Sequence, residues 1–145
     1  KNDFKILDAK LEENDNEIKV FASHDAYLKK FGYKHKREII MNKNNNCIYG
    51  NDYMTNDKNG NSVNYSIHFH LYPGIEAIKT RGGNSILIQF KKNKSLVFSS
   101  NKQNINVEKS VFLGGNKILN NFCIVISGKL ISNREIINWD IKKNI

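Results

Sequence analysis

Apolar and polar residues alternate with a period of two over most of this sequence. Residues 65–72 show it most clearly: Tyr65, Ile67 and Phe69 fall on one side, and the intervening residues fall on the other. Strict alternation indicates a half-buried β-strand, because successive side chains of a strand point to opposite faces. The same pattern, or a short apolar run, predicts further strands at residues 17–22, 85–90, 95–98, 105–107, 111–113, 123–126 and 136–141.

Turn-forming residues separate these predicted strands. Asn and Gly tolerate positive φ, which tight hairpins require; they cluster at residues 44–46, 57–61, 81–84, 114–116 and 132–133, and a lysine-rich turn is expected at 91–94. One stretch, residues 25–31, favours a helix of a turn or two. Many short strands at this spacing predict an all-β fold, a β-sandwich or stacked antiparallel sheets of about ten strands. We expect one domain over residues 1–145.

The chain carries a formal net charge of +9, from 23 Lys and Arg against 14 Asp and Glu. Only Arg37, Arg81 and Arg134 are arginines, and 23 asparagines accompany the lysines. An AT-rich coding bias accounts most simply for this composition, and an anionic partner is the alternative. Nucleic acid is disfavoured, because its readers usually rely on arginine. No apolar run approaches the roughly 18 residues of a membrane span.

His68 and His70 are two positions apart on one predicted strand, so both side chains point the same way. Such a pair can bind zinc if a third ligand arrives from another strand, at Zn–N distances of about 2.0–2.1 Å. No Asp, Glu or Cys stands at a fitting local spacing, so we assign no metal ligand in this chain. Cys123 lies in an apolar run and is interpreted as a small buried residue, and Cys47 forms no C-x-x-C pair.

The tripeptide Ser23-His24-Asp25 contains the residue types of a hydrolytic triad, but adjacent residues cannot assemble one. We expect Asp25 to cap the short helical turn that follows. His24 remains a candidate site residue, because Tyr27, His35 and Arg37 follow it in a basic, aromatic segment. Such a segment suits an acidic glycan or a nucleic acid. The alternative is a solvated strand and turn with its aromatic rings packed inward.

Five motifs in register resemble the heparinase II/III-like family. Its "ASHDGY…FG…HRR" stretch is similar to ASHDAY at 22–27, FG at 31–32 and HKR at 35–37. The family's "GED" resembles GND at 50–52, and its "FHLHPxV" resembles FHLYPGI at 69–75. Its "EESVYLG" resembles EKSVFLG at 108–114. Its closing "IVLSG…VxW" resembles IVISG at 124–128 followed by INW at 137–139. The order and approximate spacing agree from about residue 17 to the end.

This resemblance implies a specific enzyme architecture. Family members join an N-terminal α/α toroid to a C-terminal β-sandwich-like domain, and they cleave uronate-containing acidic polysaccharides by β-elimination. A base removes the proton α to the carboxyl, an acid that is often Tyr protonates the leaving oxygen, and some members hold a structural zinc. The resemblance also favours a periplasmic location.

The chain departs from the family at several points. It lacks the toroid, and the "AHAGTLSFE" and "AAHSTL" segments that carry the functional His would lie upstream of Lys1. Tyr72 replaces a frequent second His, and Ala26 replaces a frequent Gly. We therefore assign no catalytic residue in this chain. We expect a fragment that is inactive alone. Its expected partners are an acidic polysaccharide and its own toroid domain. The candidates for substrate binding are His24, Tyr27, His35, Arg37, His68 and His70. The rival hypothesis is a free-standing, non-catalytic β module that binds acidic glycans.

Overall fold

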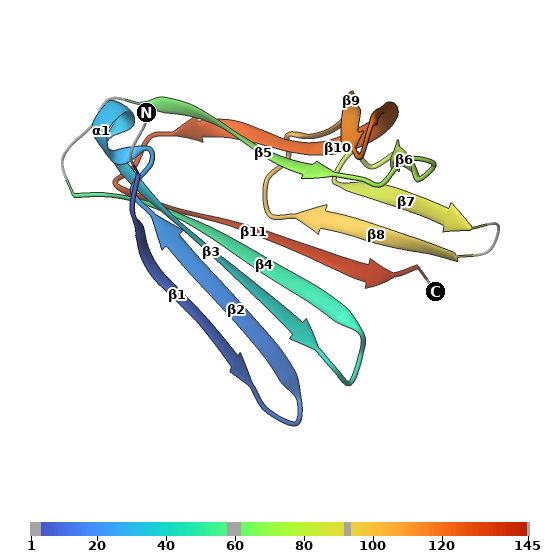
Figure 1. Cartoon of the computed structure of the whole chain (residues 1–145), viewed down its shortest axis with the longest axis horizontal. Coiled ribbons are helices and arrows are strands. Elements are labelled where there is room, and N and C mark those ends of the chain that lie inside the picture. The colour runs from blue at the N-terminus through green and yellow to red at the C-terminus, as the bar shows by residue number, and fades with distance from the viewer. Residues whose placement is uncertain (1–3, 58–61, 92–93, 145) are drawn as a thin grey trace. The chain divides into compact units, whose positions relative to one another are not determined.

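The computed structural model of the 145-residue chain describes residues 4–57, 62–91 and 94–144. In these residues the chain forms eleven strands and one four-residue helix, which Figure 1 labels in chain order. The strands belong to two sheets, of eight and three strands, and neighbouring strands run antiparallel in the pairs β1–β2, β2–β3, β3–β4, β6–β7, β7–β8 and β9–β10. The predicted all-β class is confirmed. No helix among the described residues has the length and apolar character to cross a membrane.

The described residues divide into two compact units. The first comprises residues 1–64 and 129–140, and the second comprises residues 65–128 and 141–145. This division does not test the single domain expected from the sequence, which stays a prediction.

The first unit is built from neighbouring strands in the order β1-β2-β3-β4-β11. Their bounds are β1 Ile6–Glu13, β2 Glu17–His24, β3 Tyr33–Asn42, β4 Cys47–Asn56 and β11 Arg134–Lys143, with the helix α1 at Leu28–Phe31. The pattern predicted β2 and β11, but gave no apolar alternation for β1, β3 or β4. Every residue of β1 is exposed, and β3 begins with the basic and polar run Tyr33–Glu38.

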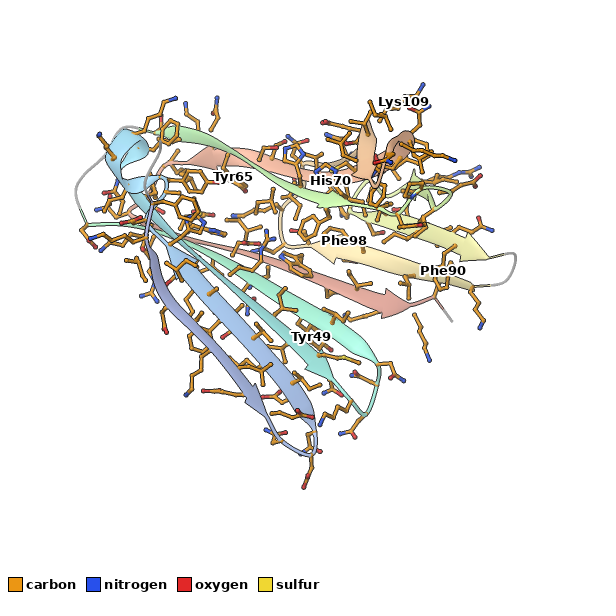
Figure 2. The ribbon with its side chains drawn as sticks, viewed as in Figure 1. Tyr49, Tyr65, His70, Phe90, Phe98 and Lys109 are labelled. Atoms are coloured by element: carbon orange, nitrogen blue, oxygen red, sulfur yellow. The ribbon has the colours of Figure 1, made fainter. Side chains whose placement is uncertain are left out.

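The second unit contains two layers. One is formed by β8-β7-β6, and the other by β5-β10-β9. Their bounds are β5 Val63–His70, β6 Glu76–Lys79, β7 Ser85–Lys91, β8 Lys94–Ser100, β9 Ile105–Gly114 and β10 Lys117–Leu130. Phe69 of β5 contacts Phe98 of β8 with ring centroids 4.9 Å apart, so the layers share an apolar core. Figure 2 labels Phe98 on β8.

Most predicted turns lie where the pattern placed them. Asn46, Gly83 and Gly115 have positive φ in the turns at 43–46, 81–84 and 115–116. The turn expected at 57–61 and the tip of the one at 91–94 fall mainly on residues 58–61 and 92–93, which lie outside the described residues. The predicted cap was wrong: the carboxylate of Asp25 accepts a hydrogen bond from the backbone of Lys5, and α1 has no side-chain cap.

Candidate functional site

The first unit contains a cluster of polar and aromatic side chains around the buried carboxylate of Asp52. Its other members are His24, Tyr27, His35, Arg37 and Trp139, and we call these six residues the Asp52 cluster. Strand register explains how it forms: His24 pairs with His35 between β2 and β3, and Arg37 pairs with Asp52 between β3 and β4. Residues paired across antiparallel strands share a face, so the side chains meet on one side of this sheet.

Asp52 is fully buried and accepts four hydrogen bonds. His35 Nε2 and Arg37 Nε bond Oδ1 at 2.7 Å, while Arg37 Nη2 and Trp139 Nε1 bond Oδ2 at 3.2 and 3.0 Å. Burial acts to raise the pKa of Asp52, but the bonds from His35 and Arg37, the Arg37 charge and the Trp139 bond together lower the pKa below its ordinary value. Asp52 is therefore an anion at neutral pH, and it holds three strands together.

The hydrogen bonds fix the tautomers of both histidines. The backbone N–H of Ala26 donates to His24 Nδ1, so His24 carries its proton on Nε2. That proton is directed at His35 Nδ1, with the two nitrogens 3.1 Å apart, and His35 donates from Nε2 to Asp52. Burial, followed by the neighbouring His35, lowers the pKa of His24 and favours its neutral form. The result is an ordered relay, Ala26–His24–His35–Asp52, in which both nitrogens of His35 are occupied.

The cluster divides its members between exposed and positioning roles. Tyr27 is 44% exposed, and its ring packs against the His24 ring with centroids 5.3 Å apart. His35 Nε2 and the Nε and Nη2 groups of Arg37 are instead directed at Asp52. The structure thus brings together the four predicted residues His24, Tyr27, His35 and Arg37, and leaves Tyr27 as the exposed member.

Two residues of the cluster were not among the sequence candidates. Asp52 and Trp139 are 87 positions apart, yet each ends one of the motifs quoted above. Gly50, in the same motif as Asp52, lies against the indole, since a Cβ at Gly50 would come within 2.0 Å of Trp139. Their membership in two family motifs was the available signal in the sequence. No sequence pattern showed that the two motifs come into contact.

The basic segment does not form one continuous surface. Alternation along β3 places Lys34 and Lys36 on the opposite face from His35 and Arg37. There Lys36 Nζ lies over the Phe21 ring at 4.3 Å, and Lys19 forms an ion pair with the buried Glu38 at 2.8 Å. Of the aromatic residues expected to pack inward, Tyr33 is buried, whereas Tyr27 and Phe31 are exposed.

The second unit holds the remaining two candidates, His68 and His70 of β5. Both are exposed, as the alternation predicted, and their rings stack with centroids 6.1 Å apart. Cys123 of β10 lies beneath them, and its Sγ is 3.7 Å from His68 Nδ1. His68, His70 and Cys123 could hold a metal ion, because one donor atom from each lies within 4.8 Å of the others. The third ligand that the sequence lacked locally comes from a neighbouring strand.

The environment of Cys123 differs from that of a surface thiol. Its side chain is 1% exposed, so the inference of a buried residue was correct. Burial raises the pKa of the thiol, and the charge of Glu108 raises it further. Glu108 is the direct partner of Cys123 between β9 and β10, so its carboxylate lies on the same face.

Comparison with known proteins identifies the family. The family model described as "Heparinase II/III-like, C-terminal" matches residues 4–140. The chain belongs to this family. A search of curated proteins gives no match.

Two solved structures of heparinase-type enzymes share the fold of this heparinase II/III-like chain. One is heparan sulfate lyase HepC from Pedobacter heparinus, at a TM-score of 0.75 and 14% sequence identity. The other is Heparinase III, at a TM-score of 0.63 and 15% identity. Each match covers 97% of this chain and 21% of the other chain, so the present chain spans about a fifth of each solved enzyme.

Proposed function

We propose that this chain is the C-terminal β-sandwich part of a polysaccharide lyase that cleaves uronate-containing acidic polysaccharide by β-elimination. The observation that carries the proposal is the family match over residues 4–140. The fold shared with two lyases, each about five times as long as this chain, supports it. We also propose that the full-length protein includes an α/α toroid domain as the partner of this chain. A structural zinc in the full-length protein, as in some family members, is part of the same proposal.

The chemistry explains why we assign the catalytic groups to residues outside this chain. β-Elimination needs a base at the carbon α to the carboxyl, an acid at the leaving oxygen, and positive or amide groups that neutralise the carboxylate. In the Asp52 cluster, His35 Nε2 and the Nε and Nη2 donors of Arg37 are directed at Asp52. The cluster therefore suits the binding of a sugar chain better than proton transfer.

Within this proposal, Tyr27 contacts the glycan, His24 offers only its ring beside Tyr27 because both of its nitrogens are bonded within the protein, and His35 and Arg37 are positioning residues. The exposed Tyr27 ring offers an apolar face for a sugar ring, and its hydroxyl offers a polar edge. Asp52 holds His35, which in turn holds His24, so the orientation of the outer imidazole depends on a buried carboxylate. His68 and His70 stay candidates for substrate contact in the second unit.

The test is an absorbance assay for unsaturated uronate with the full-length protein. Heparan sulfate, other uronate-containing polysaccharides and a neutral glucan are compared as substrates. We expect product from at least one acidic polysaccharide, none from the neutral glucan, and none from the 145-residue chain alone. Product formation by this chain alone, or no product from any acidic polysaccharide with the full-length protein, would contradict the proposal.

A variant pair tests the assigned contact. Tyr27→Ala should raise KM several-fold and change kcat less, because it removes binding surface and leaves the buried part of the Asp52 cluster intact. Tyr72→Ala is the matched control, since Tyr72 is 65% exposed and lies in the other unit. Equal effects of the two substitutions would remove Tyr27 from the binding surface.

The lysine excess favours a second candidate, a non-catalytic module that binds acidic glycans. It predicts salt-sensitive binding to the acidic polysaccharide without any unsaturated product, even in the full-length protein. The same assay, run beside a binding measurement, separates the two functions.

A further inference from the structure

The outer face of the β5-β10-β9 sheet carries a compact group of nitrogen and sulfur donors. His68 and His70 project from β5, and Cys123 projects from the adjacent strand β10. Figure 2 labels His70 at the end of β5. All three residues belong to the second unit, so the group is formed within one compact part of the chain.

The donor spacing is close to that of a coordinated ion. Zn²⁺ binds His nitrogen at about 2.0–2.1 Å and Cys sulfur at about 2.3 Å, so a tetrahedral site separates the two donors by roughly 3.6 Å. His68 Nδ1 and Cys123 Sγ are 3.7 Å apart. A donor nitrogen of His70 lies within 4.8 Å of both, so closing the site requires that ring to move by no more than about 1.5 Å. His70 is exposed, so its ring has room for this movement.

Hydroxyl groups bond the far side of each imidazole. Ser66 Oγ lies 2.8 Å from His68 Nε2, and Ser110 Oγ lies 3.3 Å from His70 Nδ1. The Ser66 contact leaves Nδ1 of His68 directed at Cys123, and the Ser110 contact leaves Nε2 of His70 as the other available nitrogen. Metal-bound histidines commonly donate their second N–H to such a partner, which fixes the ring orientation.

The charges and the ligand types both favour a transition metal. The Cys123 thiolate and the neighbouring Glu108 carboxylate together balance a divalent cation, and Glu108 is exposed beside Cys123 on the same face. Thiolate and imidazole suit Zn²⁺-like ions, whereas Ca²⁺ and Mg²⁺ require oxygen ligands. On binding, Cys123 releases its proton to solvent as the S–metal bond forms.

We propose that His68, His70 and Cys123 bind one divalent transition-metal ion of the zinc class, through His68 Nδ1, His70 Nε2 and Cys123 Sγ. The fourth position faces solvent and takes a water molecule. The ion ties β5 to β10 and stabilises this sheet. The proposal is independent of the lyase assignment, because metal binding is measured without any substrate.

The experiment is a titration of the metal-free, reduced protein with Co²⁺, a spectroscopic substitute for Zn²⁺. We expect one equivalent to produce a thiolate-to-cobalt charge-transfer band and the visible bands of tetrahedral Co²⁺, and one equivalent of Zn²⁺ to abolish both. Cys123→Ser should remove the charge-transfer band and lower the affinity more than 100-fold, a larger loss than the roughly 10–100-fold cost of an outer-shell change. Cys47→Ser is the matched control: Cys47 is also a buried cysteine outside any disulfide, but it lies in the first unit, so its replacement should change neither the charge-transfer band nor the affinity.

Two further variants keep the test decisive if Cys123→Ser fails to fold. His70→Asn removes an exposed ligand and should abolish tetrahedral coordination while the circular dichroism spectrum stays native. Ser66→Ala removes only the partner of His68 Nε2 and should weaken binding about 10- to 100-fold. The proposal is overturned if no charge-transfer band forms, if Cys47→Ser removes that band, or if folded His70→Asn binds Co²⁺ as tightly as the unaltered protein.

Discussion

The two units of this chain each bring a pair of histidines together, but they use them differently. In the first unit, His24 and His35 face each other across β2 and β3, and the buried Asp52 fixes the pair. In the second unit, His68 and His70 lie side by side on β5, where they contact the hydroxyl groups of Ser66 and Ser110 and the thiol of Cys123. The residue type is the same, and the difference lies in what is buried beside it.

A buried carboxylate turns an imidazole into a structural group. The Asp52 carboxylate accepts a hydrogen bond from His35 Nε2–H, and the backbone N–H of Ala26 determines the tautomer of His24, so hydrogen bonds fix the proton positions of this pair. A buried thiol is only a weak donor and acceptor, and serine hydroxyls can donate or accept, so neither group fixes the tautomer of an imidazole. The second pair therefore keeps nitrogen lone pairs that can be directed at a cation.

The largest expected effect comes from removing the charge of Asp52. Asp52→Asn leaves Arg37 and His35 facing a neutral amide, and should lower the free energy of unfolding by about 3 kcal/mol. This value is at the lower end of the range for broken buried ion pairs, because Arg37 is partly exposed. Urea unfolding measures the change. The control Asp57→Asn breaks an exposed ion pair with Lys34 and should cost less than about 1 kcal/mol. Equal costs would mean that Asp52 does not organise the first unit.

The close approach of Gly50 to Trp139 gives the next effect. Gly50→Ala would place a methyl group within 2.0 Å of a buried indole ring, so we expect a loss of about 2 kcal/mol from overpacking. Gly82→Ala is the matched control, because a Cβ there meets nothing within 4 Å. Thermal unfolding of both variants gives the comparison, and an unchanged melting temperature for Gly50→Ala would refute the packing described here.

Replacing one histidine from each pair tests the contrast directly. His35→Asn removes a donor from a buried carboxylate and should cost about 1–2 kcal/mol. The metal-free protein with His70→Asn should stay within about 0.5 kcal/mol of the unaltered chain, because His70 is exposed. Chemical unfolding in a chelator provides the values. A larger loss for His70 than for His35 would reverse the comparison.

The smallest effect is a pH dependence of stability that arises from His24. Because its pKa in the folded state lies below the ordinary value of 6.5, the unfolded chain takes up a proton more readily as the pH falls through this range. Its contribution to stability is therefore complete above pH 6.5 and declines as the pH falls toward the lower folded pKa. The lowered pKa of Asp52 adds a second loss below its ordinary value of 3.8. Unfolding free energies at successive pH values, with His24→Asn as reference, should show the first decline only in the unaltered chain.

Several tertiary contacts join motifs that the sequence showed only as separate stretches. The motif at 50–52 meets the one at 137–139 through Asp52 and Trp139. The motif at 69–75 meets the one at 108–114, since His70 bonds Ser110 and the rings of Tyr72 and Phe112 are 5.3 Å apart. The sequence pattern predicted most strands around these contacts but missed β1, β3, β4 and β6, whose polar or exposed residues hide the alternation.

The sequence by itself determined the all-β class, most of the turns, the family resemblance and the common direction of His68 and His70. These properties depend on local chemistry: alternation reports which face of a strand is buried, and Asn and Gly report where the backbone can turn. The tertiary structure alone decided that Asp52 anchors His35, Arg37 and Trp139, and that Cys123 completes a donor set with the second histidine pair. Strand pairing makes that difference, because it brings distant residues such as Asp52 and Trp139, 87 positions apart, into contact, and no local pattern specifies which strands become neighbours.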